Sequence, residues 1–173
     1  MSHPAHSPHP DPPSQPVGCA ILTASDTRSP ETDRSGQLIQ ELLTGAGHPI
    51  IAYQVLKDEP TLIRGCLTEW ADQAEIDVIL CNGGTGIAPR DTTYEAIEAL
   101  LEKELSGFGE LFRMLSYPEI GSRAMASRAV AGVYRGKLVF SMPGSSNAVR
   151  LAMEKLILPE LIHLSRQLKG SSL

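Results

Sequence analysis

Three glycines and an acid stand close together in the middle of the chain, directly after an apolar run. The run covers residues 76–81, the glycines are Gly83, Gly84 and Gly86, and the acid is Asp91. Because glycine lacks a Cβ and tolerates positive φ, such a loop can expose bare amide N–H groups, which bind phosphate. A carboxylate beside a phosphate repels it unless a cation lies between them, and Mg2+ commonly fills that position. The spacing indicates a phosphate-binding loop that works with magnesium.

The residues after the loop indicate the start of a helix. Thr92 and Glu95 match the capping-box pattern, and a helix that begins there would direct its partly positive end at the glycine loop. In a simpler interpretation the glycines only turn the chain and Asp91 only starts the helix. The loop alone does not decide between the two interpretations.

Two better-known phosphate loops are excluded by single residues. A Walker loop requires Gly-x-x-x-x-Gly-Lys-Ser/Thr, but the Gly136-Lys137 pair is followed by Leu138 where the hydroxyl belongs. The dinucleotide fingerprint Gly-x-Gly-x-x-Gly fails because Pro89 stands at the position of its third glycine. The chain therefore predicts neither a P-loop enzyme nor a Rossmann dehydrogenase.

Three further apolar runs, over 17–24, 50–56 and 138–142, read as strands, and several of the runs are continuously apolar, as in strands covered on both faces. In such sheets ligands bind at the carboxyl ends of the strands. The residues of interest there are Thr23, Ser25, Asp26, Asp58, Pro143, Gly144 and Ser145. Their convergence on one edge is stronger evidence than the glycine loop alone. Taken singly, each segment is also explained as an ordinary turn, and Asp58 as the cap of the helix that contains Pro60.

Segments of helical period alternate with the predicted strands. Apolar residues recur at i, i+4 spacing over 38–46, 62–71, 94–101 and 149–168. Pro159 should break or kink the last of these helices, and residues 107–121 form a less regular stretch. This alternation predicts an α/β fold, a three-layer α/β/α sandwich with a mostly parallel central sheet.

Composition narrows the class of protein. The chain has 173 residues and a formal net charge of −5, and its 15 Lys and Arg residues are scattered, so no nucleic-acid partner is expected. The three cysteines lie far apart in apolar stretches without a Cys-x-x-Cys pair, which indicates buried thiols and a reducing compartment. The chain shows neither a membrane span of roughly 18 apolar residues nor a secretory signal. We expect a cytoplasmic protein without a membrane partner.

The first residues differ in composition from the rest. Residues 1–16 are rich in Pro, His and Ser and cannot bury enough apolar surface to order themselves, which predicts a disordered tail. The remaining residues, 17–173, are expected to form a single domain.

The sequence as a whole resembles the MoaB/Mog family of molybdenum cofactor biosynthesis. The resemblance covers about residues 17–168, and the residues at 115–121 are closer to the MoaB branch than to Mog. It is carried by four motifs in the order of the family, which are Gly83-Gly84-Thr85-Gly86 through Thr93, Gly107-Phe108-Gly109 through Arg113, Ser127-Arg128 through Gly132, and Met142-Pro143-Gly144-Ser145.

The resemblance implies a fold, an assembly and a reaction. Members of the family are three-layer α/β sandwiches that form trimers or hexamers, and active members are molybdopterin adenylyltransferases. In their reaction the terminal phosphate of molybdopterin attacks the α-phosphate of ATP with magnesium, and pyrophosphate leaves. An attacking phosphate is already ionised at neutral pH, so the reaction needs no Ser, Cys or His nucleophile and no general base. It needs alignment of two anions and neutralisation of their charge.

The resemblance also implies roles for individual residues. By motif, Asp58 and Asp91 would be the catalytic acids that hold magnesium and position phosphates. The residues that would bind the substrate and the nucleotide are Thr23, Ser25, Asp26, Gly83, Gly84, Thr85, Gly86, Arg90, Ser127, Arg128, Pro143, Gly144 and Ser145. The alternative is a molybdopterin-binding or scaffold protein of the same pathway that catalyses nothing and works with the other biosynthetic proteins. The presence of both acids favours the enzyme.

Overall fold

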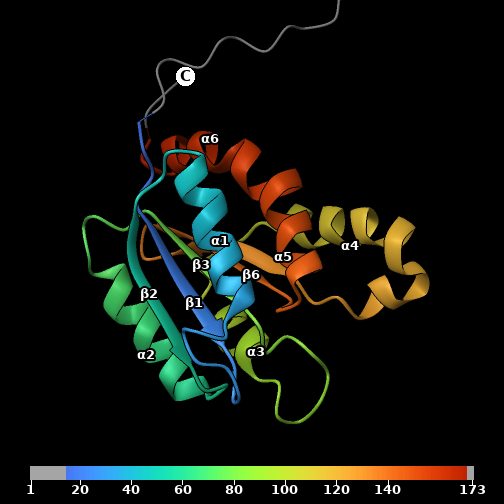
Figure 1. The fold of residues 1–173 in the computed structure, drawn as a ribbon. Helices are drawn as coiled ribbons and strands as arrows, with labels where there is room; N and C mark the ends of the chain where they lie inside the picture. The colour runs from blue at the N-terminus through green and yellow to red at the C-terminus, as the bar shows by residue number, and fades with distance from the viewer. Residues whose placement is uncertain (1–14, 171–173) are drawn as a thin grey trace, which may run out of the picture.

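A computed structural model describes residues 15–170. In it the chain folds into one six-stranded sheet between two layers of helices (Figure 1). The strands are β1 (Cys19–Ala24), β2 (Ile50–Leu56), β3 (Val78–Asn82), β4 (Lys103–Glu104), β5 (Val130–Tyr134) and β6 (Lys137–Met142). Their order is β2-β1-β3-β6-β5-β4, with parallel pairing from β2 to β6 and antiparallel pairing at β5 and β4. This confirms the predicted fold class. Most of the tail expected over residues 1–16 lies outside the described residues.

The helices divide between the two faces of the sheet, as Figure 1 and the two hydrophobic clusters both show. One face carries α1 (Arg34–Gly45), α4 (Ser106–Ile120), α5 (Ser146–Ala152) and α6 (Leu158–Leu168). The other face carries α2 (Pro60–Ala71) and α3 (Thr93–Glu98). A 3-10 helix (Gly121–Ala126) follows α4, and a π-helix (Met153–Ile157) joins α5 to α6.

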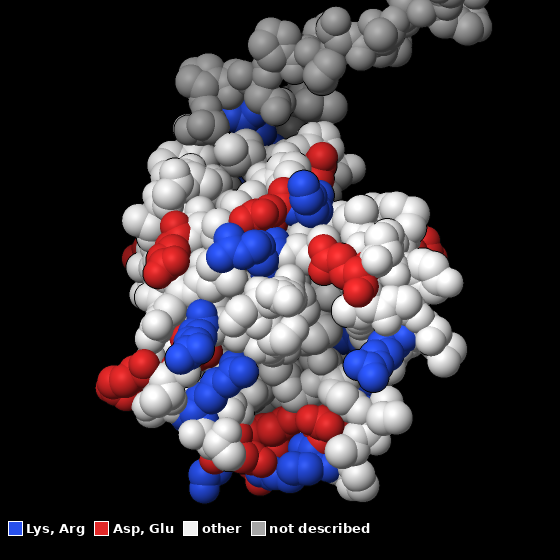
Figure 2. Space-filling view, turned by 45° about the vertical axis from the view of Figure 1, so that its right-hand side comes forward, with Lys and Arg blue, Asp and Glu red and all other residues white. Residues whose placement is uncertain are grey.

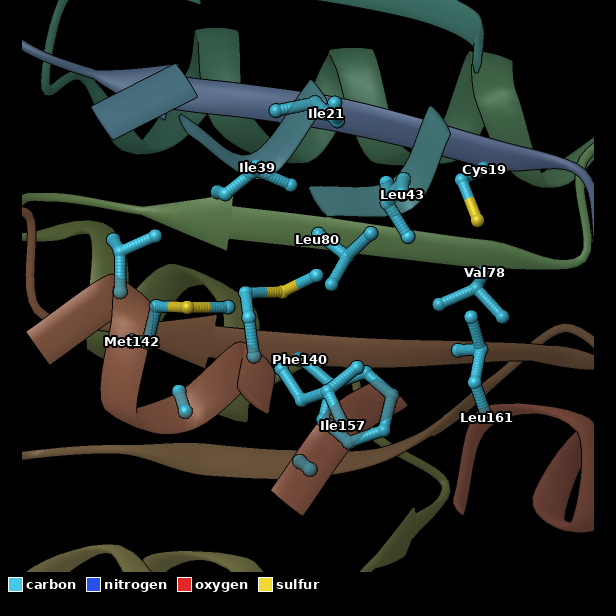
Figure 3. Close-up of a cluster of buried hydrophobic side chains, with 14 of the residues drawn as sticks. Cys19, Ile21, Ile39, Leu43, Val78, Leu80, Phe140, Met142, Ile157 and Leu161 are labelled. Atoms are coloured by element: carbon cyan, nitrogen blue, oxygen red, sulfur yellow. The ribbon is translucent and has the colours of Figure 1, made fainter. Parts of the chain in front are cut away.

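The larger core lies between the sheet and the first of these helical layers (Figure 3). Ile21, Leu80 and Phe140 form a row across three parallel strands, because Ile21 is in register with Leu80 and Leu80 with Phe140. Ile39 and Leu43 of α1 are fully buried in the same cluster. Alternate strand residues therefore face this layer, as the period of two in a strand requires.

The intervening strand residues form the second core against α2. Leu22 and Ile79 cluster there with Ile63, Leu67 and Trp70 of the helix, and all five are at most 1% exposed. Burial of both strand faces explains why the strand sequences are continuously apolar.

The cysteines are free and buried, as expected. Burial raises the pKa of the Cys19 and Cys66 thiols to about 12. Within residues 15–170, every helix is too short or too polar to cross a membrane.

The stretch that looked irregular in sequence is the helix α4. Phe108 and Phe112 are one turn apart, both are buried, and the ring of Phe108 meets that of Phe140 edge-on at 5.2 Å between centroids. Gly109 allows α4 to approach the backbone before β5 closely and does not make a turn, since a Cβ there would lie 2.5 Å from the carbonyl oxygen of Ala129. Tertiary packing thus outweighs the low helix propensity of this glycine-rich segment.

The sequence pattern also did not predict the strand β5, because a glycine interrupts its apolar run. Gly132 lies in its middle, and a Cβ at this position would stand 2.2 Å from the carbonyl oxygen of Lys103 on β4. A glycine inside a short apolar run weakens the strand signal, although here it permits the strands to pair. The interruption expected at Pro159 takes the form of a π-helix rather than a break, because α5, the π-helix and α6 follow one another without a gap and the backbone of Ile157 and Leu158 stays helical.

A buried histidine holds the chain just before β1. His48 is 5% exposed, and its Nδ1 accepts a hydrogen bond of 3.1 Å from the amide of Val17. Burial lowers the pKa of His48 below its usual value. The unfolded chain therefore binds a proton on this residue at a higher pH than the folded chain does, and folding stability falls as pH decreases through about 6.5.

We expect the free energy of unfolding to decrease between about pH 7 and about pH 5, above the range in which carboxylates titrate. In a His48→Gln variant the amide oxygen can still accept from Val17 but cannot titrate, so the decrease should be smaller. Urea unfolding at a series of pH values measures both curves. Parallel curves for the two proteins would show that another group causes the pH dependence.

Candidate functional site

The parallel strands end together at one edge of the sheet. Thr23 of β1 is in register with Asn82 of β3, and Asn82 with Met142 of β6. The loops that follow these strands therefore meet, as expected for the carboxyl edge of a parallel sheet. In Figure 1 this edge is the lower end of the molecule, where the loop before α3 projects.

The glycine loop fits against its neighbours only because it lacks side chains. Gly83 and Gly84 have φ values of 92° and 63°, in the left-handed region that favours glycine. A Cβ on Gly83 would lie 2.3 Å from the carbonyl oxygen of Ala24, and one on Gly84 would lie 2.3 Å from Oδ2 of Asp58. Close packing against two neighbouring loops thus requires glycine at both positions.

The carboxylate of Asp58 joins the loop after β2 to the start of α3. The residue is 5% exposed. Its Oδ1 accepts hydrogen bonds from the amide of Thr92 (3.1 Å), the hydroxyl of Thr92 (2.8 Å) and the hydroxyl of Thr93 (2.9 Å). Its own amide donates to Oδ1 of Asp26 at 3.2 Å. A buried carboxylate needs such partners, and these partners set the position of α3 relative to β2.

The predicted helix start at Thr92 is confirmed, but two predicted side-chain caps do not form. Asp58 does not cap α2, whose N-cap residue is Glu59 without a side-chain hydrogen bond, because its carboxylate turns toward α3 instead. Thr92 is the N-cap residue of α3, but the capping box with Glu95 does not form. The Thr92 hydroxyl donates to Asp58, and the Glu95 carboxylate accepts from Arg128.

Asp91 lies at the other end of the glycine loop. Its Oδ2 accepts a 3.2 Å hydrogen bond from the amide of Ala88, and a Cβ on Gly86 would lie 2.5 Å from the same oxygen. Asp58 and Asp91 thus both contact the loop, and each has one carboxylate oxygen, Oδ2 and Oδ1 respectively, that accepts no hydrogen bond from the described residues.

These free oxygens are compatible with magnesium. Residues 15–170 hold no group of three or more His, Cys, Asp or Glu side chains suited to a metal. Mg2+ does not require such a group, because it is commonly held by one or two carboxylates together with substrate phosphates and water. The donor set suits a metal that arrives with a phosphate ligand.

Arg90, in the loop before α3, forms ion pairs with acids from the loops after β1 and β2. It forms a bidentate pair with Asp26, with Nε–Oδ2 and Nη2–Oδ1 distances of 2.7 and 2.8 Å, and its Nη1 lies 2.9 Å from Oε1 of Glu59. The hydrogen bonds from Arg90 hold the pKa of Asp26 below its usual range. In Figure 2 acidic and basic side chains stand side by side at this end of the molecule.

The loop after β6 packs against the glycine loop. A Cβ on Gly144 would lie 3.0 Å from Cα of Gly83. The carbonyl oxygen of Gly144 accepts hydrogen bonds from Arg28 Nη2 (3.2 Å) and from the hydroxyl of Ser35 (2.5 Å). Sequence reasoning did not identify Arg28, whose only signal was its position two residues after Asp26.

The remaining predicted residues lie at the same edge and have mainly structural contacts. Thr23 is fully buried and its hydroxyl accepts from Asn82 Nδ2 at 2.8 Å, and the Ser25 hydroxyl accepts from the amide of Arg28 at 3.1 Å. Ser145 is the N-cap of α5 and accepts from the amide of Ala148, while Pro143 and Ser127 are half-buried.

A hollow of about 440 Å3 opens beside the glycine loop, on its α2 side. It is lined by Pro60 and Arg64 of α2, by Ile87 and Asp91 of the loop, and by Glu95 of α3, among others. One of the two acids thus faces a space large enough for part of a small ligand.

A mostly parallel sheet covered on both faces, with a glycine loop and two acids at its carboxyl edge, defines an α/β protein of the class that binds ligands at that edge. Comparison with known proteins gives the family. Residues 20–163 match the family described as a probable molybdopterin binding domain. The chain belongs to this family, and within it to the molybdenum cofactor biosynthesis protein B (MoaB) branch.

Relatives match the chain along almost its whole length. The molybdenum cofactor biosynthesis protein B of Bacillus cereus is 58% identical over 153 residues, which are 88% of this chain and 90% of that protein. A crystal structure of a molybdenum cofactor biosynthesis protein B has 56% identity and a TM-score of 0.88, covering 91% of this chain and 98% of the other. The molybdopterin biosynthesis enzyme MoaB of Thermus thermophilus has 38% identity and a TM-score of 0.78, covering 89% and 97%.

The contact between Gly84 and Asp58 gives a stability prediction. A Gly84→Ala variant should lose about 1–3 kcal/mol of unfolding free energy to backbone strain, because alanine is strained at positive φ. It should lose more because its methyl group would displace Asp58. The matched control is Gly65→Ala on α2, where a Cβ meets nothing within 4 Å, and this change should stabilise by about 1 kcal/mol. Urea unfolding distinguishes them. Equal stability of the two variants would contradict the close packing of the loop.

Proposed function

We propose that the protein binds molybdopterin and adenylylates it with ATP and Mg2+, with release of pyrophosphate. The observation that carries the proposal is the pair of acids, Asp58 and Asp91, that contact opposite ends of one glycine loop. One carboxylate oxygen of each accepts no hydrogen bond from residues 15–170. Relatives named for molybdenum cofactor biosynthesis support the choice of substrate.

The residues at the edge match the needs of phosphoryl chemistry. Two anions must be held in contact, and the loop amides supply hydrogen-bond donors for phosphate oxygens. Asp58 and Asp91 would hold Mg2+, which neutralises charge on the transferring phosphate when it is bound. The attacking group is a phosphate oxygen, so the residues of the chain need only align and hold the reactants.

Two of the arginines beside the loop are matched by acids. Arg90 is paired with Asp26 and Glu59, and Arg128 with Glu95. A phosphate at this site therefore gains little from these two side chains, and the amides, the metal and Arg64, which lines the hollow, would supply most of the attraction.

The second candidate function is binding without turnover, as a molybdopterin-binding or scaffold protein that works with other proteins of the pathway. The contacts of Asp58 favour this alternative in one respect, because three hydrogen bonds to its Oδ1 already account for the residue as a structural link. Asp91 has only one such bond, so Asp91 distinguishes the two functions better.

The test is incubation of the purified protein with molybdopterin, ATP and Mg2+, followed by analysis for adenylylated molybdopterin and pyrophosphate. We expect the wild-type protein to form both products. We expect Asp91→Asn to retain its fold and molybdopterin binding and to lose at least ~100-fold in rate, the scale of removing a group that stabilises transition-state charge.

Glu41→Gln, an exposed acid on α1, is the matched control and should leave the rate unchanged. Binding of molybdopterin by the wild type without any adenylylated product would favour the scaffold function. An unchanged rate in Asp91→Asn would remove this residue from catalysis.

We also propose that the chain self-associates, as a trimer or a hexamer, through α4 and the 3-10 helix that follows it. Large apolar side chains are exposed there, namely Leu111, Met114, Tyr117, Ile120 and Met125, and the last of them is 84% exposed. Some of them line a shallow apolar hollow of about 510 Å3. Figure 2 shows a largely uncharged surface on the side where α4 projects. Contiguous apolar surface of this kind marks contact sites between proteins.

Sedimentation velocity tests this assembly. The wild-type protein should sediment at three or six times the mass of one chain, and Met114→Glu should weaken association by at least about tenfold because it places a charge in an apolar contact. The control is Leu62→Glu on α2, where the exposed leucine lies on the opposite layer, and this variant should assemble normally. A wild-type protein that sediments as a single chain would contradict the proposal.

A further inference from the structure

Arg128 stands beside the glycine loop although it comes from a distant part of the sequence. It lies two residues before β5, whose first residue, Val130, is in register with Ser141 near the end of β6. Because β5 runs antiparallel to β6, its beginning lies at the carboxyl edge of the parallel strands. The side chain of Arg128 is 25% exposed.

The guanidinium of Arg128 has contacts on several sides. Its Nε donates to the carbonyl oxygen of Thr85 at 2.9 Å, and its Nη2 donates to the carbonyl oxygen of Gly86. Nη1 and Nη2 both donate to the carboxylate of Glu95, and the guanidinium carbon lies 4.6 Å from the centroid of the Tyr94 ring. All three guanidinium nitrogens donate hydrogen bonds, and the carboxylate of Glu95 balances the positive charge. Arg128 is therefore already paired within the protein and is not an unpaired cation available to a ligand.

These contacts determine how the peptide groups of the glycine loop are turned. In a trans peptide the carbonyl and the following N–H point in opposite directions, so the amides of Gly86 and Ile87 point away from Arg128. The neighbouring carbonyl of Gly84 accepts from the amides of Thr93 and Tyr94 in α3. Three successive carbonyls are thus directed toward protein groups.

The amides of the same loop have no such partners. None of the hydrogen bonds among the described residues is donated by the amides of Gly84, Thr85, Gly86 or Ile87. A run of unpartnered amide N–H groups is a binding site for an anion if the peptide planes are held in place. Gly86 has no Cβ to restrict its rotation, so the two hydrogen bonds from Arg128 supply the restriction.

We propose that Arg128 is a positioning residue, which orients the amides at 84–87 toward a phosphate without contacting the ligand. The inference deepens the proposed function and rests on the phosphate site within it. Glu95 and Tyr94, from the first turn of α3, hold the guanidinium in the plane that this role requires. Lysine cannot replace Arg128 in this role. Its ammonium group lacks the planar, branched geometry with which the guanidinium donates to two carbonyls and a carboxylate at the same time.

Calorimetric titration with inorganic pyrophosphate tests the proposal without relying on catalysis. Arg128→Lys keeps the charge but loses the fork, and we expect it to weaken pyrophosphate binding by about 10- to 100-fold, the range for residues that orient binding groups. Arg128→Gln should weaken binding by a similar factor. The control is Arg135→Gln, which removes a cation from the turn between β5 and β6 at the opposite end of the sheet, where Arg135 pairs with Asp72, and it should change affinity little.

Glu95→Ala gives the sharpest distinction, because the two explanations predict opposite signs. The variant removes a negative charge near the site, so binding by simple charge attraction would become tighter. A positioning role predicts weaker binding, because Arg128 loses the partner that holds it. Backbone 15N relaxation should show larger motion at residues 84–87 in Glu95→Ala and Arg128→Lys, with β1 and α2 unchanged as evidence of an intact fold.

The outcomes separate this inference from the proposed function. Pyrophosphate binding by the wild type that is unaffected in Arg128→Lys, or tighter in Glu95→Ala, would overturn the positioning role alone. A wild-type protein that binds no pyrophosphate would overturn the phosphate site and the positioning role together. Weaker binding in both variants with greater loop motion would support the role.

Discussion

The loops at the carboxyl edge of the sheet depend on the burial of one carboxylate, that of Asp58. An ion of this kind is costly in a protein interior unless its oxygens are hydrogen-bonded, and here the donors come from the start of α3. The glycine at position 84 leaves the space that the carboxylate occupies. One chemical requirement therefore fixes the distance between two strand ends, the beginning of a helix and the path of the loop between them.

Around the Asp58 carboxylate, the arginines of the edge form ion pairs with acids. Arg90 is held by acids from two loops, and Arg128 by an acid from α3. Exposed pairs of this kind contribute little to stability, and their value lies in the direction they impose on the backbone. The proposed phosphate site thus differs from a surface patch of basic residues, because main-chain dipoles oriented by the fold would carry its attraction for anions.

Much of this arrangement was predictable from the sequence. The continuous apolar runs identified the parallel strands, and the rule that loops meet at the carboxyl edge brought the acids to the glycine loop. What local patterns could not provide were partners distant in sequence. Thr92 and Glu95 have capping-box spacing, yet each bonds to a residue more than thirty positions away. The strand β5 contains Gly132, whose value appears only beside the backbone of β4.

The contact between Gly144 and Arg28, residues 116 positions apart, has a consequence for the newly made chain. During synthesis the loop after β1 leaves the ribosome long before the loop after β6, so the edge of the sheet is incomplete until most of the polypeptide has emerged. Contacts between such distant segments also form slowly, because closing a long loop costs entropy before any contact compensates for it. A ligand that requires the complete edge can bind only chains in which the loop after β6 has folded into place, and its binding then stabilises that folded state.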